Sequence, residues 1–170
     1  YAYEGSARVP FIVVPPRNVR HGIRPVAQEV VELRDVMPTL LDAAGLDTPK
    51  TVDGQSLIPL LTAPAATWRD YIHGEHCTCY SPEQEMQYVT DGRKKLVWLP
   101  RTGQEQFFDL ERDRGETTNL RHDPARHDEV ALWRGRLIEE LRERDCGWAA
   151  DGELCPPADA PLASPWRDRR

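Results

Sequence analysis

The sequence has 170 residues and a formal net charge of −6 at pH 7, with 39% hydrophobic and 29% charged residues. This composition fits a globular protein, and no apolar stretch approaches the roughly 20 residues that a membrane helix needs. The acidic balance argues against nucleic acid as a partner, because the phosphate backbone binds basic surfaces. We therefore expect no membrane span and no nucleic-acid partner.

Four cysteines leave both the disulfide pattern and the localisation open. They allow several pairings, and their spacing favours none of them. The four are Cys77, Cys79, Cys146 and Cys155.

The first candidate element is an apolar strand. Phe11 to Val14 read FIVV, an unbroken apolar run closed by Pro15 and Pro16, which is typical of a strand covered on both faces. Parallel partners of such a strand arrive through a crossover of a dozen or more residues. No such segment precedes Tyr1. We therefore expect these residues to be the end of a longer protein.

A helix is predicted next, after a stretch rich in Pro and Gly. Asp35 is a suitable N-cap, Pro38 is tolerated in the first turn, and Gly45 supplies a left-handed stop. The apolar face of this helix would consist of Leu40, Leu41 and Ala44. A turn and a short apolar segment follow at residues 53–61. Up to about residue 65, the order of strand, loop and helix is typical of an α/β protein.

From residue 69 onward the pattern changes to short strands joined by tight turns. The candidate strands read DYIHGEHC, EMQYVT, KKLVWLP and EQFFDL. Asp91-Gly92 and Thr102-Gly103 are hairpin turn signals between them. Together they predict an antiparallel meander, with Trp98, Phe107 and Phe108 in its core.

The last predicted element is a helix that covers one face of the meander. Asp123 would cap it and Pro124 would occupy its first position. Its apolar face, at helical spacing, consists of Val130, Trp133, Leu137, Ile138 and Leu141. Residues 146–170 are rich in proline, and we expect them to be poorly ordered. The predicted organisation is thus residues 1–65, residues 69–145 and this tail.

The order of five motifs along the chain resembles the C-terminal part of a type I sulfatase, an arylsulfatase-like member of the alkaline phosphatase superfamily. The motifs are YEGSARVPFIVVPP, LRDVMPTLLDAAG, VDGQSLIPLL, YVTDGRKKLVW and EQFFDLERDRGETTNL. The resemblance runs from Tyr3 to about Leu141. It implies the end of an alkaline-phosphatase-like α/β sulfatase domain in residues 1–65. A small antiparallel sheet of about four strands with a covering C-terminal helix would follow.

The resemblance also implies that the reacting groups lie before Tyr1. In sulfatases an active-site lysine closely precedes the Tyr-Glu-Gly stretch, and the formylglycine nucleophile and the carboxylates that bind a divalent metal ion, calcium by this resemblance, lie further upstream. We thus expect no catalytic residue and no metal ligand in this chain. The partners would be the missing N-terminal catalytic portion and a sulfate ester of a small molecule or sugar. The alternatives are a phosphodiester or phosphonate monoester hydrolase of the same superfamily and a non-catalytic module that covers the substrate.

Residues of the first motif are expected to be structural. These residues are Tyr3, Glu4, Gly5, Arg8 and Pro10. Glu4 and Arg8 are spaced to pair across one helical turn, although Arg8 could instead face the sulfate. Where relatives often have Asp-Pro before their Glu-x-x-Asn-Leu pattern, this chain has Asp113-Arg114-Gly115, which changes a turn and no inferred active-site position.

The densest local cluster of chemically active side chains is HGEHCTC. On a strand, His73, Glu75, Cys77 and Cys79 would share one face and His76 would lie on the other. Side chains two apart on one strand stand nearly parallel, which argues against a zinc site. His76 is the candidate for the substrate pocket, where it could donate to a sulfate or to the organic part of the substrate. The alternative is a packed or solvated histidine.

Overall fold

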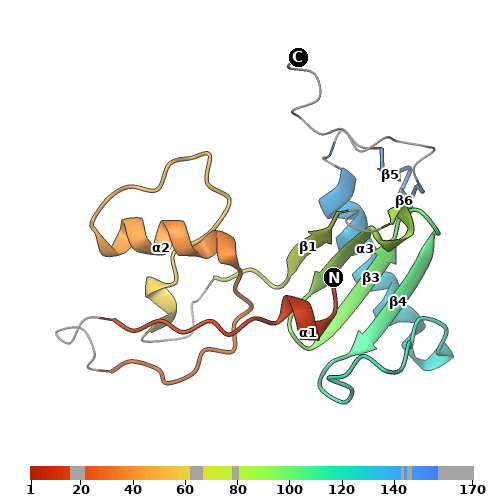
Figure 1. The fold of residues 1–170 in the computed structure, drawn as a ribbon, viewed down its shortest axis with the longest axis horizontal. Helices are drawn as coiled ribbons and strands as arrows, with labels where there is room; N and C mark the ends of the chain where they lie inside the picture. Colours follow the sequence, from red (N-terminus) through yellow and green to blue (C-terminus); the bar gives the residue numbers. More distant parts are fainter. Residues whose placement is uncertain (16–21, 62–66, 78–80, 143, 145–146, 157–170) are drawn as a thin grey trace. The chain divides into compact units, whose positions relative to one another are not determined.

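The computed structural model describes residues 1–15, 22–61, 67–77, 81–142, 144 and 147–156. The chain divides into two compact units, one formed by Tyr1–Val9 with His73–Arg170 and the other by Pro10–Ile72 (Figure 1). The first nine residues thus pack with the segment that the sequence assigned to the small sheet.

The larger unit is built on a four-stranded antiparallel sheet with strand order β1-β2-β3-β4. The strands are β1 (Ile72–His76), β2 (Met86–Thr90), β3 (Lys94–Leu99) and β4 (Gln104–Asp109). β2 pairs with β3 in a register that sets Val89 opposite Leu96, and β3 pairs with β4 so that Leu96 faces Phe107. The predicted meander is confirmed.

The hairpin turns follow from their residues. Gly92 has φ 82° and Gly103 has φ 68°, which is backbone that L side chains rarely adopt. Asp91 closes the first turn, since its Oδ1 accepts from the amide nitrogens of Arg93 and Lys94, each at 2.8 Å. The turn residues therefore fix the register of β2 against β3.

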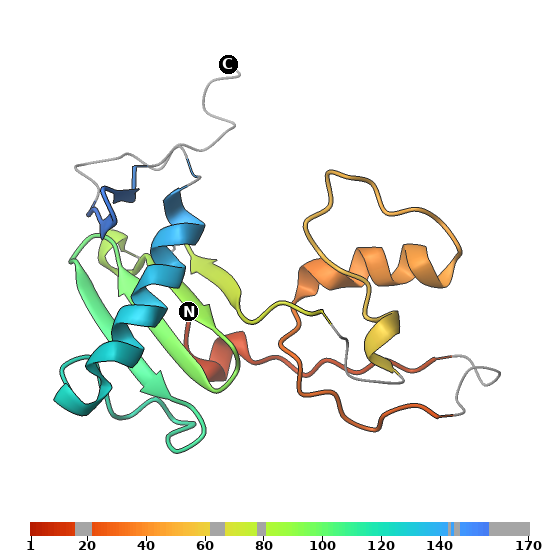
Figure 2. The same ribbon diagram turned by 180° about the vertical axis from the view of Figure 1, so that it is seen from behind.

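Helix α3 (His127–Arg142) covers one face of the sheet and contacts β2 and β3 (Figure 2). A 3-10 turn (Pro124–Arg126) leads into it, and Asp123 Oδ1 accepts from the amide of Ala125 at 2.9 Å, as the predicted cap requires. Its buried side chains are Val130, Trp133, Leu137 and Leu141. The helix is confirmed, and so is its predicted buried face except for Ile138, which is only partly buried.

The opposite face of the sheet is covered by the start of the chain and by α1 (Glu4–Ala7) (Figures 1 and 2). Here the core consists of Ala2, Met86, Val97, Phe108 and Leu110. Successive strand residues alternate between faces, so Phe107 and Leu96 lie on the α3 side while Phe108 and Val97 lie on the α1 side. The predicted core residues Trp98, Phe107 and Phe108 are all buried.

The expectation of a poorly ordered tail differs from the structure over a few residues. Strands β5 (Ala149–Ala150) and β6 (Glu153–Leu154) form a short antiparallel hairpin. Gly152 in its turn has φ 78°. Leu154 is buried. The glycine turn and this apolar side chain order the segment, which the proline content alone did not predict. Residues 157–170 lie outside the described residues.

The smaller unit contains α2 (Val36–Ala43), preceded by a 3-10 turn (Leu33–Asp35) and followed by another (Ile58–Leu61). Gly45 ends α2 with φ 69°, as predicted. The predicted apolar face is not buried within the described residues, since Leu40 is 64% exposed and Pro38 and Thr39 are buried instead. That expectation was wrong because it assumed a covering layer, and none of the described residues supplies it.

The predicted strand at Phe11–Val14 is also absent from the described structure. These residues have no regular secondary structure, and Ile12 and Val14 are 83% and 69% exposed. A strand exists only where a neighbour completes its hydrogen-bond ladder. None of the described segments provides that ladder, so the apolar run stays unpaired.

In the described part of the chain, no helix combines the length and the apolar character that crossing a membrane requires.

Candidate functional site

The side chains singled out by the sequence meet on the face of the sheet that the start of the chain covers. Tyr3 Oη donates to Gln106 Oε1 at 2.9 Å, and its ring lies edge-on to Phe108 with 6.3 Å between ring centroids. The carbonyl of Tyr3 accepts from the amides of Ser6 and Ala7, each at 2.8 Å. The tyrosine therefore anchors one end of α1 to the sheet and starts its first turn.

Glu4 is the most highly connected side chain of this segment. Its Oε1 lies 2.7 Å from Lys95 Nζ, and its Oε2 lies 3.6 Å from Arg8 NH1. The predicted ion pair between Glu4 and Arg8 is thus present. Gly5 has open space around it, where a Cβ would meet no atom within 4 Å. Pro10 lies beyond α1 and is exposed.

His76, the pocket candidate, lies at the end of β1 on this same face. Its ring stacks on Tyr1 with centroids 4.7 Å apart. The backbone nitrogen of Tyr1 lies 3.3 Å from Nδ1. Because this nitrogen can only donate, Nδ1 accepts and Nε2 carries the proton. That Nε2 is shielded from solvent and has no hydrogen-bond partner among the described residues.

The imidazole of His76 is held in its neutral form near pH 7. Desolvation by burial is the largest cause of a lowered pKa for His76. A neutral imidazole with a proton on Nε2 is a hydrogen-bond donor without a charge.

His73 and Glu75 lie on the other face, as the alternation of the strand predicts. His73 Nδ1 accepts from Arg144 NH2 at 3.2 Å, and its Nε2 therefore donates to Gln87 Oε1 at 2.8 Å. Arg144 NH1 also pairs with Glu75 Oε2 at 2.7 Å. Burial is the largest cause of a lowered pKa for His73. These contacts join β1 to the end of α3 and describe a packed polar cluster.

The described residues do not fit a metal ion. None of their His, Cys, Asp and Glu side chains forms a group of three or more arranged to hold one. Cys77 is exposed and Cys155 is partly buried, whereas Cys79 and Cys146 lie outside the described residues. The described residues therefore offer no ligand set for the divalent ion that the family resemblance implies.

Two residues that matter on this face were missed by the sequence reasoning. Lys95 on β3 is fully buried and contacts Glu4 and Glu116, and Glu116 Oε1 lies 2.9 Å from Lys95 Nζ. The sequence did contain a signal for this contact. A lysine at a core-facing position of an alternating strand needs acidic partners, so the position of Lys95 could have predicted them. Glu116 belongs to the motif GETTNL, which the sequence reasoning used only to recognise the family.

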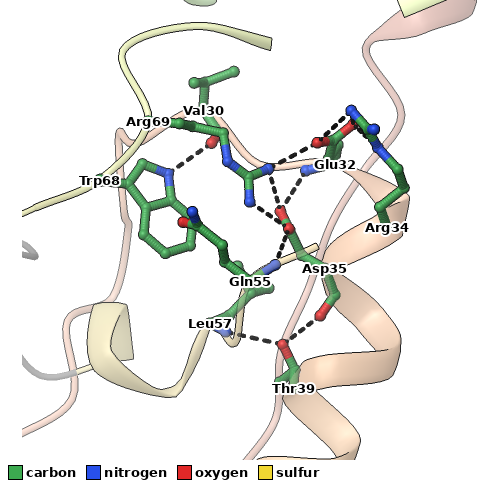
Figure 3. A network of polar contacts seen from close by, with 9 residues as sticks. All are labelled: Val30, Glu32, Arg34, Asp35, Thr39, Gln55, Leu57, Trp68 and Arg69. Atoms are coloured by element: carbon green, nitrogen blue, oxygen red, sulfur yellow. Dashed lines mark hydrogen bonds and ion pairs between the residues drawn. The ribbon is translucent and has the colours of Figure 1, made fainter. Parts of the chain in front are cut away.

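The smaller unit holds a second polar network, centred on the buried carboxylate of Asp35 (Figure 3). Arg69 donates to it through NH2 at 2.6 Å and NH1 at 3.0 Å. The amides of Gln55 and Glu32 also donate to it, each at 2.9 Å. Asp35 occupies the N-cap position of α2, as predicted, but its side chain makes no capping bond to that helix. The carboxylate instead joins three segments of the unit.

Thr39 and Gly54 complete this network. Thr39 Oγ1 donates to the carbonyl of Asp35 at 2.6 Å and accepts from the amide of Leu57 at 2.9 Å (Figure 3). A Cβ on Gly54 would lie 2.0 Å from the carbonyl oxygen of Arg34. The glycine thus lets the VDGQSL segment approach α2 closely enough for its amides to donate. The network therefore gives the VDGQSL motif a structural role.

Comparison with known proteins gives one family match and close relatives. The chain matches, over residues 1–144, the family model described as N-sulphoglucosamine sulphohydrolase, C-terminal. An arylsulfatase of Clostridium perfringens (strain 13 / Type A) is 43% identical over 153 residues, which are 89% of this chain and 31% of the relative.

Solved structures show the same fold. A 2-O GAG sulfatase superposes with a TM-score of 0.58 at 28% identity, over 64% of this chain and 24% of the other. A phosphonate monoester hydrolase from Silicibacter pomeroyi gives a TM-score of 0.53 at 27% identity, over 74% of this chain and 29% of the other.

The chain spans about a third or less of the length of these relatives. Its four-stranded antiparallel sheet and C-terminal helix are shared with alkaline-phosphatase-like α/β sulfatases. The chain therefore belongs to the N-sulphoglucosamine sulphohydrolase C-terminal family and corresponds to the C-terminal part of a sulfatase of the alkaline phosphatase superfamily.

Proposed function

We propose that the protein to which this chain belongs is a sulfuric ester hydrolase. The observation that carries the proposal is the family match over residues 1–144, together with 43% identity to an arylsulfatase over 89% of the chain. The family description names a sulphoglucosamine, so sulfated sugars are a substrate class to test alongside small sulfate esters.

The reacting groups are proposed to lie in the portion that precedes Tyr1. There, the hydrate of a formylglycine would attack sulfur while a histidine protonates the leaving oxygen. A bound divalent ion, calcium in this proposal, would stabilise negative charge on the transferring group.

The chain itself would complete and frame the catalytic domain. We propose that residues 1–65 end the α/β domain, that residues 69–145 form the small sheet subdomain, and that Tyr3, Glu4, Gly5, Arg8 and Pro10 act structurally. The contacts of Tyr3 and Glu4 support this role. Arg8 pairs with Glu4, which favours the structural role over one that faces the sulfate.

Apolar side chains support the preceding portion as the partner of the smaller unit. Ile12 and Val14 are largely exposed, and so are Leu33, Met37 and Leu40 along one side of the α2 region. Exposed apolar groups in such number usually mark an interface. In the proposed whole protein, Phe11–Val14 would find its strand neighbours there.

His76 is proposed as a substrate-pocket residue. Its Nε2 is a shielded donor with no partner among the described residues, and a buried polar atom of this kind calls for an acceptor. We propose that the substrate supplies it. Tyr1 and Gln84 flank the ring, with Tyr1 Oη donating to Gln84 Oε1 at 2.9 Å.

A phosphonate monoester hydrolase is the second candidate. The structural likeness to the Silicibacter pomeroyi enzyme favours it, since its TM-score of 0.53 approaches the 0.58 of the sulfatase. The two activities differ at the transferred group, which is a sulfate in one and a phosphonate in the other.

Comparison of aryl sulfate and aryl phosphonate turnover by the full-length protein tests the proposal. We expect kcat/KM for the sulfate to exceed that for the phosphonate, and the reverse order would replace the first candidate by the second. In the same assay, we expect His76→Ala to raise KM or lower kcat, because a shielded donor is lost. Unchanged kinetics would return His76 to a packing role.

A further inference from the structure

Lys95 is a fully buried lysine to which the proposed reaction assigns no role. All three of its N–H donors are used. They bind the carbonyl of Ala2 at 2.8 Å, Glu4 Oε1 at 2.7 Å and Glu116 Oε1 at 2.9 Å. A charge that is withdrawn from water needs such complete pairing to be tolerated.

The groups that surround Lys95 come from segments far apart in the sequence. Ala2 and Glu4 belong to the start of the chain, and Glu116 belongs to the loop after β4. Glu116 also accepts the amide of Glu4 through Oε2 at 2.6 Å. With Arg8 on the outer side of Glu4, two cations alternate with two anions, so the cluster is balanced in charge.

The backbone around Glu116 is arranged around this contact. Glu116 has φ 54°, a left-handed conformation that is strained for a residue with a side chain. Asp113 supports the loop by accepting from the amide of Thr118 at 2.8 Å and from Thr117 Oγ1 at 3.1 Å. Such strain persists only where the surroundings hold the residue, and here they present its carboxylate to Lys95.

We propose that Lys95, Glu4 and Glu116 form a latch that holds Tyr1–Arg8 on the sheet and thereby positions the chain that precedes Tyr1. The inference rests on the proposed function insofar as it concerns the reaction, because the reacting groups are proposed to lie in that preceding portion. Consecutive Cα atoms are about 3.8 Å apart, so fixing Ala2 restricts the residue before Tyr1 closely. The latch residues touch no substrate and are positioning residues.

Hydrogen exchange of the full-length protein tests the latch without reference to activity. We expect Lys95→Met to speed the exchange of the amides of Ser6, Ala7 and Arg8 by about tenfold or more, because α1 opens locally. Lys94→Met is the matched control. Lys94 is the neighbour on β3, lies on the opposite face and pairs with Asp109 at 2.8 Å.

The control should leave exchange in α1 unchanged even if it lowers overall stability. Equal exchange in α1 for the two variants would overturn the latch. If Lys95→Met fails to fold, Glu116→Gln serves instead. This substitution replaces only one carboxylate oxygen of Glu116, so it removes either the acceptor for the Glu4 amide or the acceptor for Lys95 Nζ. Glu116→Gln should speed the exchange of the same amides to a smaller extent. Unchanged exchange in this variant would equally overturn the proposal.

Steady-state kinetics with an aryl sulfate test the positioning role. We expect Lys95→Met to lower kcat by about tenfold or more while KM changes little, because misplacement of reacting groups acts on the chemical step. Lys94→Met should keep the wild-type kcat. A kcat for Lys95→Met equal to that of the control would show that the latch is structural only and would overturn the positioning role.

Failure of the latch and failure of the proposed function remain distinguishable. If the wild-type full-length protein does not hydrolyse an aryl sulfate, the proposed function fails and the positioning role fails with it. The exchange measurement then still decides whether the latch holds Tyr1–Arg8. If the wild-type protein is active and exchange is unchanged, the latch alone fails.

Discussion

Gly54 illustrates how one residue sets the packing of the smaller unit. A Cβ at this position would lie 2.0 Å from the carbonyl oxygen and 2.4 Å from the carbonyl carbon of Arg34. These are backbone atoms, which cannot move aside as a flexible side chain could. The close approach also allows Gln55 to donate its amide to Asp35.

We expect Gly54→Ala to destabilise the smaller unit by about 1–3 kcal/mol, because the clash forces the VDGQSL segment away from α2. Hydrogen exchange of the α2 amides in the full-length protein should accelerate accordingly. The matched control is Gly135→Ala in α3, where a Cβ would meet open space; it should be neutral or stabilising by up to about 1 kcal/mol. Equal exchange of α2 in wild type and Gly54→Ala would contradict the packing account.

At the residue scale, the sequence predicted which face His76 would occupy, but not the partners of Lys95. The alternation of a strand fixes faces locally, so His76 could be separated from His73 and Glu75. The contact of Lys95 with Glu4 and Glu116 joins residues far apart in the sequence. Such contacts depend on the tertiary fold, and no local pattern specifies them.

At the scale of elements, β1 and α3 are joined by the polar cluster of His73, Gln87, Glu75 and Arg144. Burial lowers the pKa of His73 below its ordinary value. The folded protein therefore binds a proton at His73 less readily than the unfolded chain does. The stability due to the neutral imidazole is complete above the ordinary pKa of about 6.5 and is lost as the pH falls through the lower folded pKa.

We expect the melting temperature of the wild-type protein to fall as the pH is lowered from about 8 to about 5, and to fall less for His73→Gln. His76, whose pKa is also lowered by burial, acts with the same sign, so the variant should retain part of the dependence. His127→Gln, at an exposed position of α3, is the control and should keep the wild-type slope. The account would be contradicted by the same slope in His73→Gln and wild type.

The elements of the larger unit could be predicted almost completely, and those of the smaller unit less so. Strands β2 to β4 and helix α3 satisfy their hydrogen bonds and bury their apolar faces within this chain, so local patterns and turn residues sufficed. Phe11–Val14 and the face around Leu40 carry patterns that need a covering layer. None of the described residues supplies that layer, and the predictions there were wrong for this reason.

At the scale of the whole molecule, the family membership rests on residues 1–144, whereas the proposed activity depends on groups that we propose to precede Tyr1. The chain spans 31% of the arylsulfatase that it resembles. Its described side chains include the shielded Nε2 of His76 and the buried Lys95, which binds Glu4 and Glu116. In the proposed function this chain frames the catalytic domain, and the reacting groups lie in the portion before Tyr1.

The most direct test of the proposal that the reacting groups precede Tyr1 is an assay of aryl sulfate hydrolysis. Residues 1–170 alone are compared with the full-length protein, with and without calcium. The full-length protein should turn over the ester, and the chain alone should not, because the loss of a nucleophile typically removes many orders of magnitude of rate. Turnover by the chain alone at roughly a thousandth of the full-length rate or more would contradict the account, since the reacting groups would then lie among these residues.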